Sequence, residues 1–453
     1  MSKRLLLALG LLVGSAFLAR YFAGSPGDSS GSLNEAFFSY FSAPAQSTRG
    51  YQCVCQNIIG TEFVGGCGRN EMECTGKCKE YHDLYEFVRL ESNARCDFVV
   101  GGQPRCQGQG LSVWDFAVSY DRAVSIDFGR SGMSRGLLIY RRTEGRPQDP
   151  AGKAIGLAPV AGGGFVPAVD LPNGIVGWDL RSLDDQIAVF DADADGFLQE
   201  TLIYRPGFGR ARLAKFASGA FSQIWDGPNG IEQWDLRDAL DRIVPIDADG
   251  DGRLQEILIY RPGAGKARML RFANNAWYPL WDGPSGIDTW DLRSPGDVVV
   301  SFDADGDGRT QEILIYRRGG GRALARAFKY TNNAWLTIWD GPGGPDPWNL
   351  GGEVIAGDFD GDNLRQEIVI YVPGQGKARL LKFVKQLTLM WSGGVSGIGA
   401  FDLSNANDQL MTFAYNDQPG DEILAYRPGS PGCFAQFVTF ANGGFRTVYP
   451  LQR

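Results

Sequence analysis

The sequence predicts an all-β protein, a β-propeller of about six four-stranded blades preceded by a small disulfide-rich module. Three observations predict this fold. A short phrase recurs at a nearly constant spacing, each repeat contains four strand-like runs, and an aspartate-rich turn follows the first run in most repeats. Tandem units of about 40–50 residues with four strands each are typical of propellers.

The repeat is marked by a tyrosine in variants of the phrase LIYRPG. These tyrosines are spaced by 64, 56, 56, 55 and 55 residues: Tyr140, Tyr204, Tyr260, Tyr316, Tyr371 and Tyr426. A second phrase, of the form WDLR, marks Trp178, Trp234 and Trp290. Six units therefore lie within residues 110–453. A seventh blade would have to come from residues 30–110, which contain no matching phrase.

The third repeat shows the four strand-like runs most clearly. They cover residues 242–247, 256–262, 267–273 and 276–283. β-Branched and aromatic residues dominate these runs, and Gly, Pro, Asn and Asp separate them. One such sheet cannot bury both of its faces alone, whereas radial stacking buries them and leaves only short edges. This favours a propeller over a β-solenoid, whose repeats are shorter.

An acidic loop lies between the first and second predicted strands of the second to fifth repeats. Aspartates at its positions 1, 3 and 5 place carboxylates around one point, and Ca²⁺ prefers six to eight oxygen ligands. The loop is not an EF-hand, because position 12 of the third repeat is Leu258 instead of glutamate. The predicted ligands of about four Ca²⁺ sites are Asp191, Asp193, Asp195, Asp247, Asp249, Asp251, Asp303, Asp305, Asp307, Asp358, Asp360 and Asp362.

The loop, followed at once by an apolar strand that ends in YRPG, resembles the FG-GAP or VCBS repeat. That repeat builds integrin α-subunit propellers and occurs in many exported adhesins and lectins. The resemblance covers roughly residues 110–453 and implies a calcium-binding propeller. It says less about activity, because the same fold serves adhesion proteins, sugar-binding lectins and some polysaccharide lyases.

One departure from the family concerns the last ligand. The family usually has aspartate at position 9, where this chain has glutamine, followed by glutamate at position 10. Either Gln199 and its counterparts supply a neutral oxygen, or the glutamates bind the ion, which we expect because an anionic oxygen suits a hard cation. These glutamates are Glu200, Glu256, Glu312 and Glu367. Alternatively, the glutamate caps the strand or pairs with a basic neighbour, since Glu422 persists in the sixth repeat, which has lost the triad.

The N-terminal region predicts export. Residues 1–23 are interpreted as a signal peptide or signal anchor, because a basic start precedes an apolar run of 15 residues, from Leu5 to Ala19. Residues 24–48 have the composition of a flexible stalk. A Cys-rich module over 49–109 and the propeller over 110–453 follow. We expect a secreted chain, or a membrane-anchored one with the propeller on the non-cytosolic side.

Eight cysteines predict disulfides: Cys53, Cys55, Cys67, Cys74, Cys78, Cys96, Cys106 and Cys433. A zinc site is disfavoured because His82 is the single histidine of the chain. Seven of the cysteines lie in the N-terminal module, so complete pairing would require Cys433 to reach back to it. One stretch of this module, residues 79–91, has helix-like composition.

Charge and composition narrow the function. The net charge of −8 argues against a nucleic-acid partner, and a single histidine leaves no repeated acid–base group. We therefore interpret the chain as a binding protein and not an enzyme, a recognition or adhesion module for a glycan or protein ligand. The alternatives are a structural subunit of an extracellular or membrane-associated assembly, and a polysaccharide-active enzyme such as a lyase. Membrane contact is expected only through an N-terminal anchor.

Overall fold

The computed structural model describes residues 51–56, 62–68 and 86–92, residues 114 and 116, and most of 118–448, with gaps at 131–134, 144–151, 161–163, 319–323, 342–351, 416–418 and 430–434. The chain divides into two units, Met1–Thr48 and Arg49–Arg453. The predicted signal and stalk and most of the Cys-rich module lie outside the described residues. Within the described part, no helix has the length and apolarity that a membrane crossing requires.

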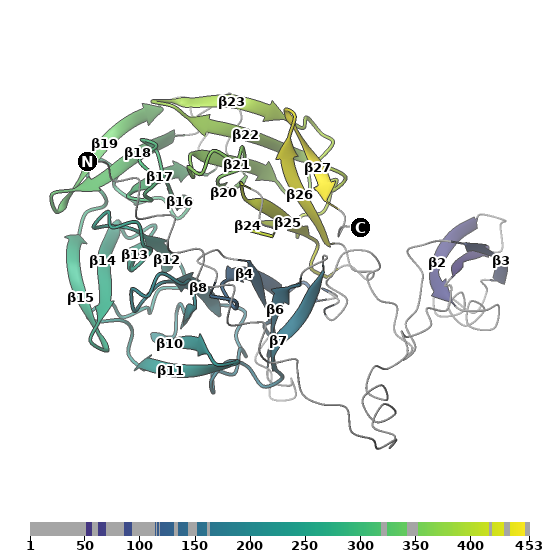
Figure 1. The fold of residues 1–453 in the computed structure, drawn as a ribbon, viewed down its shortest axis with the longest axis horizontal. Coiled ribbons are helices and arrows are strands. Elements are labelled where there is room, and N and C mark those ends of the chain that lie inside the picture. The colour runs from purple at the N-terminus through teal and green to yellow at the C-terminus, as the bar shows by residue number, and fades with distance from the viewer. Residues whose placement is uncertain are drawn as a thin grey trace, which may run out of the picture. The chain divides into compact units, whose positions relative to one another are not determined.

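Six four-stranded antiparallel sheets form a ring, which confirms the predicted propeller with six blades (Figure 1). The first strands of the blades line the centre, and each contacts the next until the last contacts the first: β4 (Asp121–Ile126), β8 (Gln186–Phe190), β12 (Arg242–Ile246), β16 (Asp297–Phe302), β20 (Glu353–Gly357) and β24 (Gln409–Phe413). The second strands are β5 (Gly136–Arg141), β9 (Glu200–Arg205), β13 (Glu256–Arg261), β17 (Glu312–Arg317), β21 (Glu367–Val372) and β25 (Glu422–Tyr426).

The third and fourth strands complete each blade toward the outside of the ring (Figure 1). The third strands are β6 (Lys153–Pro159), β10 (Arg210–Ala217), β14 (Lys266–Ala273), β18 (Leu324–Thr331), β22 (Lys377–Phe383) and β26 (Ala435–Ala441). The fourth strands are β7 (Phe165–Leu171), β11 (Ala220–Gly227), β15 (Ala276–Gly283), β19 (Ala334–Gly341), β23 (Leu387–Ser392) and β27 (Gly444–Val448). The four runs predicted for the third repeat agree with β12 to β15 to within one residue at either end.

A separate three-stranded sheet, in the order β2-β1-β3, comprises β1 (Tyr51–Gln56), β2 (Glu62–Gly68) and β3 (Glu86–Ser92). The helix-like interpretation of 79–91 is therefore wrong from Glu86 onward, because antiparallel pairing with β1 overrides local helical propensity. Three of the cysteines lie on β1 and β2, but the side chains there, and the other five cysteines, lie outside what the structure describes. The disulfides remain a prediction.

The second strand of each blade is buried on both faces. In β13 the residues from Glu256 to Tyr260 are all buried, and only the terminal Arg261 is partly exposed. This is expected where one face of a sheet packs on the preceding blade and the other face on the following one. The apolar second strands, of which EILIY in β13 and β17 is one form, therefore contribute to both contacts that each blade makes with its neighbours.

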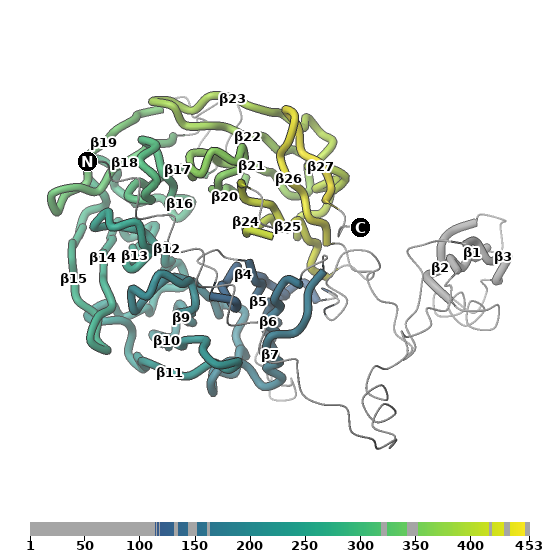
Figure 2. Tube along the Cα trace, viewed as in Figure 1, coloured from purple at the N-terminus to yellow at the C-terminus, as the bar shows by residue number. Residues whose placement is uncertain are grey.

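The repeated tyrosine joins neighbouring blades. The Tyr204 hydroxyl accepts a hydrogen bond from the backbone N–H of Ile243 in the next blade, over 3.2 Å. Equivalent hydrogen bonds, each 3.2 Å long, are donated by the Val299 N–H to the Tyr260 hydroxyl and by the Leu410 N–H to the Tyr371 hydroxyl. The Tyr426 hydroxyl accepts from Ala123 over 3.1 Å, so the last blade closes on the first without sharing a strand (Figure 2).

The arginine after this tyrosine and the WDLR phrase form one buried cluster. Asp185 is fully buried, and Arg205 binds it twice, Nε to Oδ1 over 2.7 Å and Nη2 to Oδ2 over 2.9 Å. The Trp178 indole N–H donates to the same carboxylate over 2.9 Å, and the guanidinium lies 5.2 Å from the centre of that ring. The same arrangement recurs in the next blade with Arg261, Asp241 and Trp234. These tryptophans are therefore structural.

Replacing Tyr204 with phenylalanine leaves the buried Ile243 N–H without its acceptor, so we expect the free energy of unfolding to fall by about 1–3 kcal/mol. Equilibrium urea unfolding of the full chain measures this change. The matched control is Tyr278→Phe, at a tyrosine of β15 that is 46% exposed. Equal losses for the two variants would show that the inter-blade bond contributes nothing.

Candidate metal centres

Each acidic loop of blades two to five is folded around its first aspartate. The Asp191 carboxylate is buried, and it accepts the backbone N–H groups of Asp195 over 3.0 Å and Gly196 over 2.9 Å. Gly196 has a φ of 86°, a left-handed conformation that favours glycine. In the fifth blade Asn363 takes this place with a φ of 67°, which asparagine tolerates better than most residues. The loop therefore curls back and directs its carboxylates inward.

Carboxylate oxygens converge at four places among the described residues. Within each group the oxygens lie no more than 4.8 Å apart: Asp191, Asp193 and Asp195; Asp247, Asp249 and Asp251; Asp303, Asp305 and Glu312; Asp358, Asp360 and Asp362. Calcium–oxygen distances are about 2.3–2.6 Å, so oxygens up to about 5 Å apart can share one ion. These four groups could therefore hold metal ions. In the fourth blade, Glu312 takes the place predicted for Asp307.

The glutamate at position 10 fastens the loop to the second strand. Glu200 Oε2 accepts the backbone N–H of Ala192, the second loop residue, over 3.0 Å. Its counterparts do the same in the next three blades: Glu256 at 2.9 Å, Glu312 at 3.0 Å and Glu367 at 3.0 Å. Glu422 also accepts such a bond, from Tyr415 over 2.7 Å, in a blade that has no triad. The structural role expected for this glutamate therefore does not depend on a metal.

A basic side chain from the third strand faces each acidic loop. Lys215 Nζ lies 2.8 Å from Asp195 Oδ2 and 3.0 Å from Glu200 Oε1, and it also pairs with Asp193. The corresponding residues are Arg271, Lys329 and Lys382. Each of these four bases is the direct cross-strand partner of its glutamate. Every triad thus has one internal cation of its own.

These bases were not predicted as part of the sites, although the hairpin contained a signal for them. The RPG turn fixes the register of the second and third strands. Counting residues outward from the turn along both strands places Lys215 opposite Glu200. In the sixth blade Ile423 pairs with Val438, so the same register places Thr439 opposite Glu422. The base is therefore absent from a blade whose loop has lost its aspartates.

Burial and charge shift the acidity of these groups. Burial raises the pKa of Glu200 to about 8, and it raises the pKa values of Glu256, Glu312 and Glu367 to about 7. Burial also raises the pKa of Asp191. For Asp195, burial acts in the same direction, but the hydrogen bonds from Lys215, the Phe197 N–H and Arg130, together with the charge of Lys215, outweigh it and the pKa is lowered. The inner carboxylates therefore carry an electrostatic strain that a cation relieves.

The glutamines at position 9 make other contacts. Gln199 donates from Nε2 to the Asp127 carbonyl of the first blade over 3.0 Å. Gln255 donates to Asp251 Oδ2 over 2.7 Å. In the first blade, Asp127 Oδ1 accepts the N–H of Gly129 over 3.0 Å, and no group of acids that could hold a metal is found among the described residues of that blade.

Comparisons with known proteins identify no family for this chain. No protein-family model matches the chain, and no curated protein matches it. Similar solved structures include the periplasmic gluconolactonase PpgL of Pseudomonas aeruginosa, at 12% identity and a TM-score of 0.39, covering 89% of this chain and 100% of that one. The α-L-arabinanase of Penicillium chrysogenum complexed with arabinobiose is similar at 9% identity and a TM-score of 0.41, covering 73% of this chain and 93% of that one. The rhamnogalacturonan lyase YesW is similar at 14% identity and a TM-score of 0.32, covering 75% of this chain and 70% of that one.

These comparisons correct the expectation that the chain is not an enzyme. The three similar structures are named as a gluconolactonase, an arabinanase and a lyase, so they do not support that expectation. The physical reason is that a fold does not determine the chemistry carried on it. At these identities and TM-scores, the likeness carries no argument about what this chain acts on.

The raised pKa of Glu200 predicts how stability depends on pH in the presence of a chelator. The ordinary pKa is 4.5, and the folded value is about 8, so between these values the folded state binds a proton that the unfolded state has lost. The free energy of unfolding should therefore fall as pH rises from about 5 to 8. The Glu200→Gln variant should reduce this slope by up to about 1.4 kcal/mol per pH unit.

Urea unfolding at a series of pH values measures the slope. The control is Asp170→Asn, at an exposed residue of β7 outside the acidic loops. An unchanged slope in Glu200→Gln would contradict the assignment.

Proposed function

We propose that the chain is a calcium-binding propeller with about four Ca²⁺ sites, one in each acidic loop of blades two to five. The observation that carries this proposal is the convergence of three carboxylates in each of these loops. The donors are hard, anionic oxygens, which suit Ca²⁺ or Mg²⁺ and not the softer metals that thiolates and imidazoles select. The irregular arrangement of oxygens in a curled loop favours Ca²⁺, because Mg²⁺ demands a nearly ideal octahedron.

Charge supports a bound cation in addition to the internal base. The loop of the second blade brings Asp191, Asp193, Asp195 and Glu200 together against two bases, Lys215 and the more exposed Arg130. When all of these groups are ionised, two negative charges remain uncompensated at close range, and such like charges destabilise the folded loop. A divalent ion offsets this excess. The aspartates would hold the ion, the glutamate would fasten the loop, and the base would balance the outer carboxylates.

We further propose that calcium makes this face of the ring a rigid surface for recognising a glycan or a protein. Support comes from the resemblance of the loops to FG-GAP or VCBS repeats and from the predicted export of the chain. Calcium sites of extracellular modules bind in the range of about 0.1–1 mM, so an exported propeller would be loaded where it acts. Binding to the folded state alone also stabilises that state.

Calcium should raise the thermal stability of the full chain, and a chelator should lower it. Each site contributes about 2.7 kcal/mol when calcium is at a hundred times its Kd. Isothermal titration calorimetry should detect about four sites, and Asp251→Asn should weaken one of them roughly tenfold or more, because a ligand charge is lost.

The matched control for calcium binding is Asp170→Asn, which removes an exposed carboxylate of β7 outside the loops and should leave all sites intact. Unchanged melting temperatures with calcium and with chelator would overturn the calcium proposal. They would show that the internal bases alone neutralise the loops.

A glycan array probed with and without chelator tests the recognition function. We expect binding to a limited set of glycans that is lost when calcium is removed. Absence of glycan binding at any calcium concentration would overturn the glycan proposal and leave a protein ligand. Incubating the chain with acidic polysaccharides, while following the ultraviolet absorbance of unsaturated products, detects lyase activity directly.

A further inference from the structure

A pocket of about 170 Å³ lies at the centre of the ring, where the first strands of four blades meet the ends of their neighbouring loops. The first strands contribute Ser125, Val189, Pro245 and Ser301. The loops contribute Leu198, Leu254, Thr310 and Arg365, which hold equivalent places two residues before each second strand. The volume is comparable to that of a cavity that holds benzene.

The backbone of the pocket is fixed in place by bonds between blades. The carbonyl groups of Leu254, Thr310 and Arg365 accept the N–H groups of the first aspartates in the preceding loops, over 2.8, 3.2 and 3.0 Å. The Leu198 carbonyl accepts the corresponding bond from the first blade, over 2.8 Å. The lining is therefore pre-organised, which reduces the entropy lost when a ligand binds.

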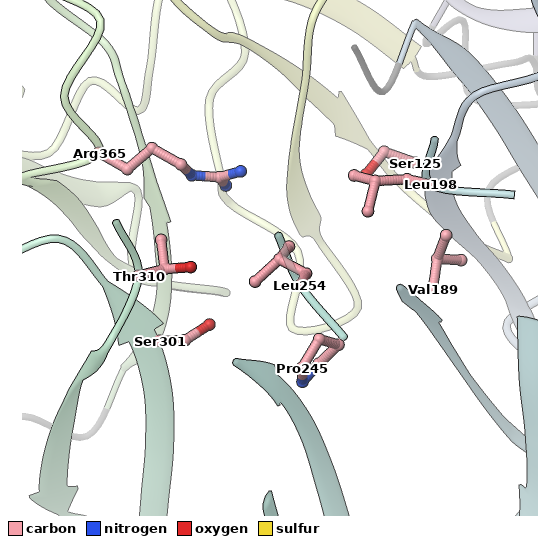
Figure 3. A pocket seen from close by; sticks show the side chains of 8 residues that line it. All are labelled: Ser125, Val189, Leu198, Pro245, Leu254, Ser301, Thr310 and Arg365. Atoms are coloured by element: carbon pink, nitrogen blue, oxygen red, sulfur yellow. The ribbon is translucent and has the colours of Figure 1, made fainter. Parts of the chain in front are cut away.

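The lining has a polar side and an apolar side. Figure 3 shows the Arg365 guanidinium with the hydroxyls of Thr310 and Ser301 on one side of the space. The rest of the lining is mostly aliphatic: Leu198, Leu254, Val189 and Pro245. The surface that these residues expose to the pocket is mostly polar, so hydrogen-bonding groups dominate what a ligand meets there. Among the described residues that line this pocket, Arg365 alone is charged.

Arg365 has hydrogen-bonding capacity that the described residues leave unused. Its Nη2 donates to the Ala356 carbonyl over 3.3 Å and lies 3.9 Å from Asp421 Oδ2, which is long for an ion pair. Its Nε is buried without a hydrogen-bond partner among the described residues. A guanidinium with unused donors binds a carboxylate through two parallel hydrogen bonds.

We propose that the central pocket binds a small organic carboxylate, whose charged group pairs with Arg365 and whose apolar body contacts the leucine, valine and proline side chains. Thr310 and Ser301 would donate hydroxyl hydrogen bonds to the same carboxylate. The four aliphatic side chains of the lining offer contacts to an organic body that inorganic phosphate would not make. Four of the lining residues belong to the acidic loops, but none of the lining residues is a proposed calcium ligand.

Benzoate is the probe, because it combines a carboxylate with a body the size of benzene, and benzamide is its neutral counterpart. Ligand-observed NMR titration of the full chain should show benzoate binding, with benzamide at least about tenfold weaker. Arg365→Gln should weaken benzoate binding roughly tenfold or more. Arg365→Lys should weaken it less, because lysine keeps the positive charge and loses only the pair of parallel N–H donors of the guanidinium. Melting curves of each variant report whether the fold is intact.

The matched control is Arg309→Gln, which removes the same charge from an exposed residue of a neighbouring loop that does not line the pocket. It should bind benzoate as the native chain does. The proposal is overturned if the native chain shows no benzoate binding at about 10 mM, if benzamide or phosphate binds as well as benzoate, or if Arg365→Gln binds unchanged. Running the titration with calcium and with chelator separates a failure of this pocket from a failure of the calcium proposal.

Discussion

Burial of both faces of every second strand is the constraint on which the whole propeller depends. A single sheet of four strands has too little apolar surface around it to cover EILIY on both sides, so each blade needs two neighbours. Packing between blades also removes backbone N–H groups from water. The hydroxyls of Tyr204 and Tyr426 accept hydrogen bonds from two of these groups. Ring closure follows once all six blades obey this rule.

The loops inherit their geometry from that packing. The second strand of every blade except the first begins with a glutamate whose burial is imposed by the neighbouring blades, and this glutamate accepts a hydrogen bond from the second loop residue. The loop then has little freedom, and its first aspartate is drawn to the end of the first strand. The fold therefore brings the carboxylates together even without an ion. The raised pKa values of Glu200 and Asp191 show that ionising these buried groups is unfavourable. Positive charge stabilises the ionised carboxylates. Lys215 supplies such a charge in this loop, and a divalent ion would supply more.

The sequence was most informative where one residue pattern acts within one repeat. Strand positions followed from local alternation and turn residues, and the triads followed from the spacing of Asp191, Asp193 and Asp195. The bases were missed because their place depends on hairpin register and not on nearness in the chain. The central pocket was missed because Ser125 and Arg365 come from blades that are far apart in sequence. The exclusion of catalysis failed because a missing histidine says little about a site assembled from several blades.

The seam between the sixth and first blades has a further consequence. Each blade is made from one continuous segment, and the seam is closed by side-chain packing and the bond between Ala123 and Tyr426, with no strand exchanged across it. No sheet therefore depends on which blade comes first in the chain, because each sheet contains only four consecutive strands. A circular permutant that opened the loop between two other blades and joined the present ends would keep all six sheets whole. The same independence suits growth of such a protein by tandem duplication of one blade.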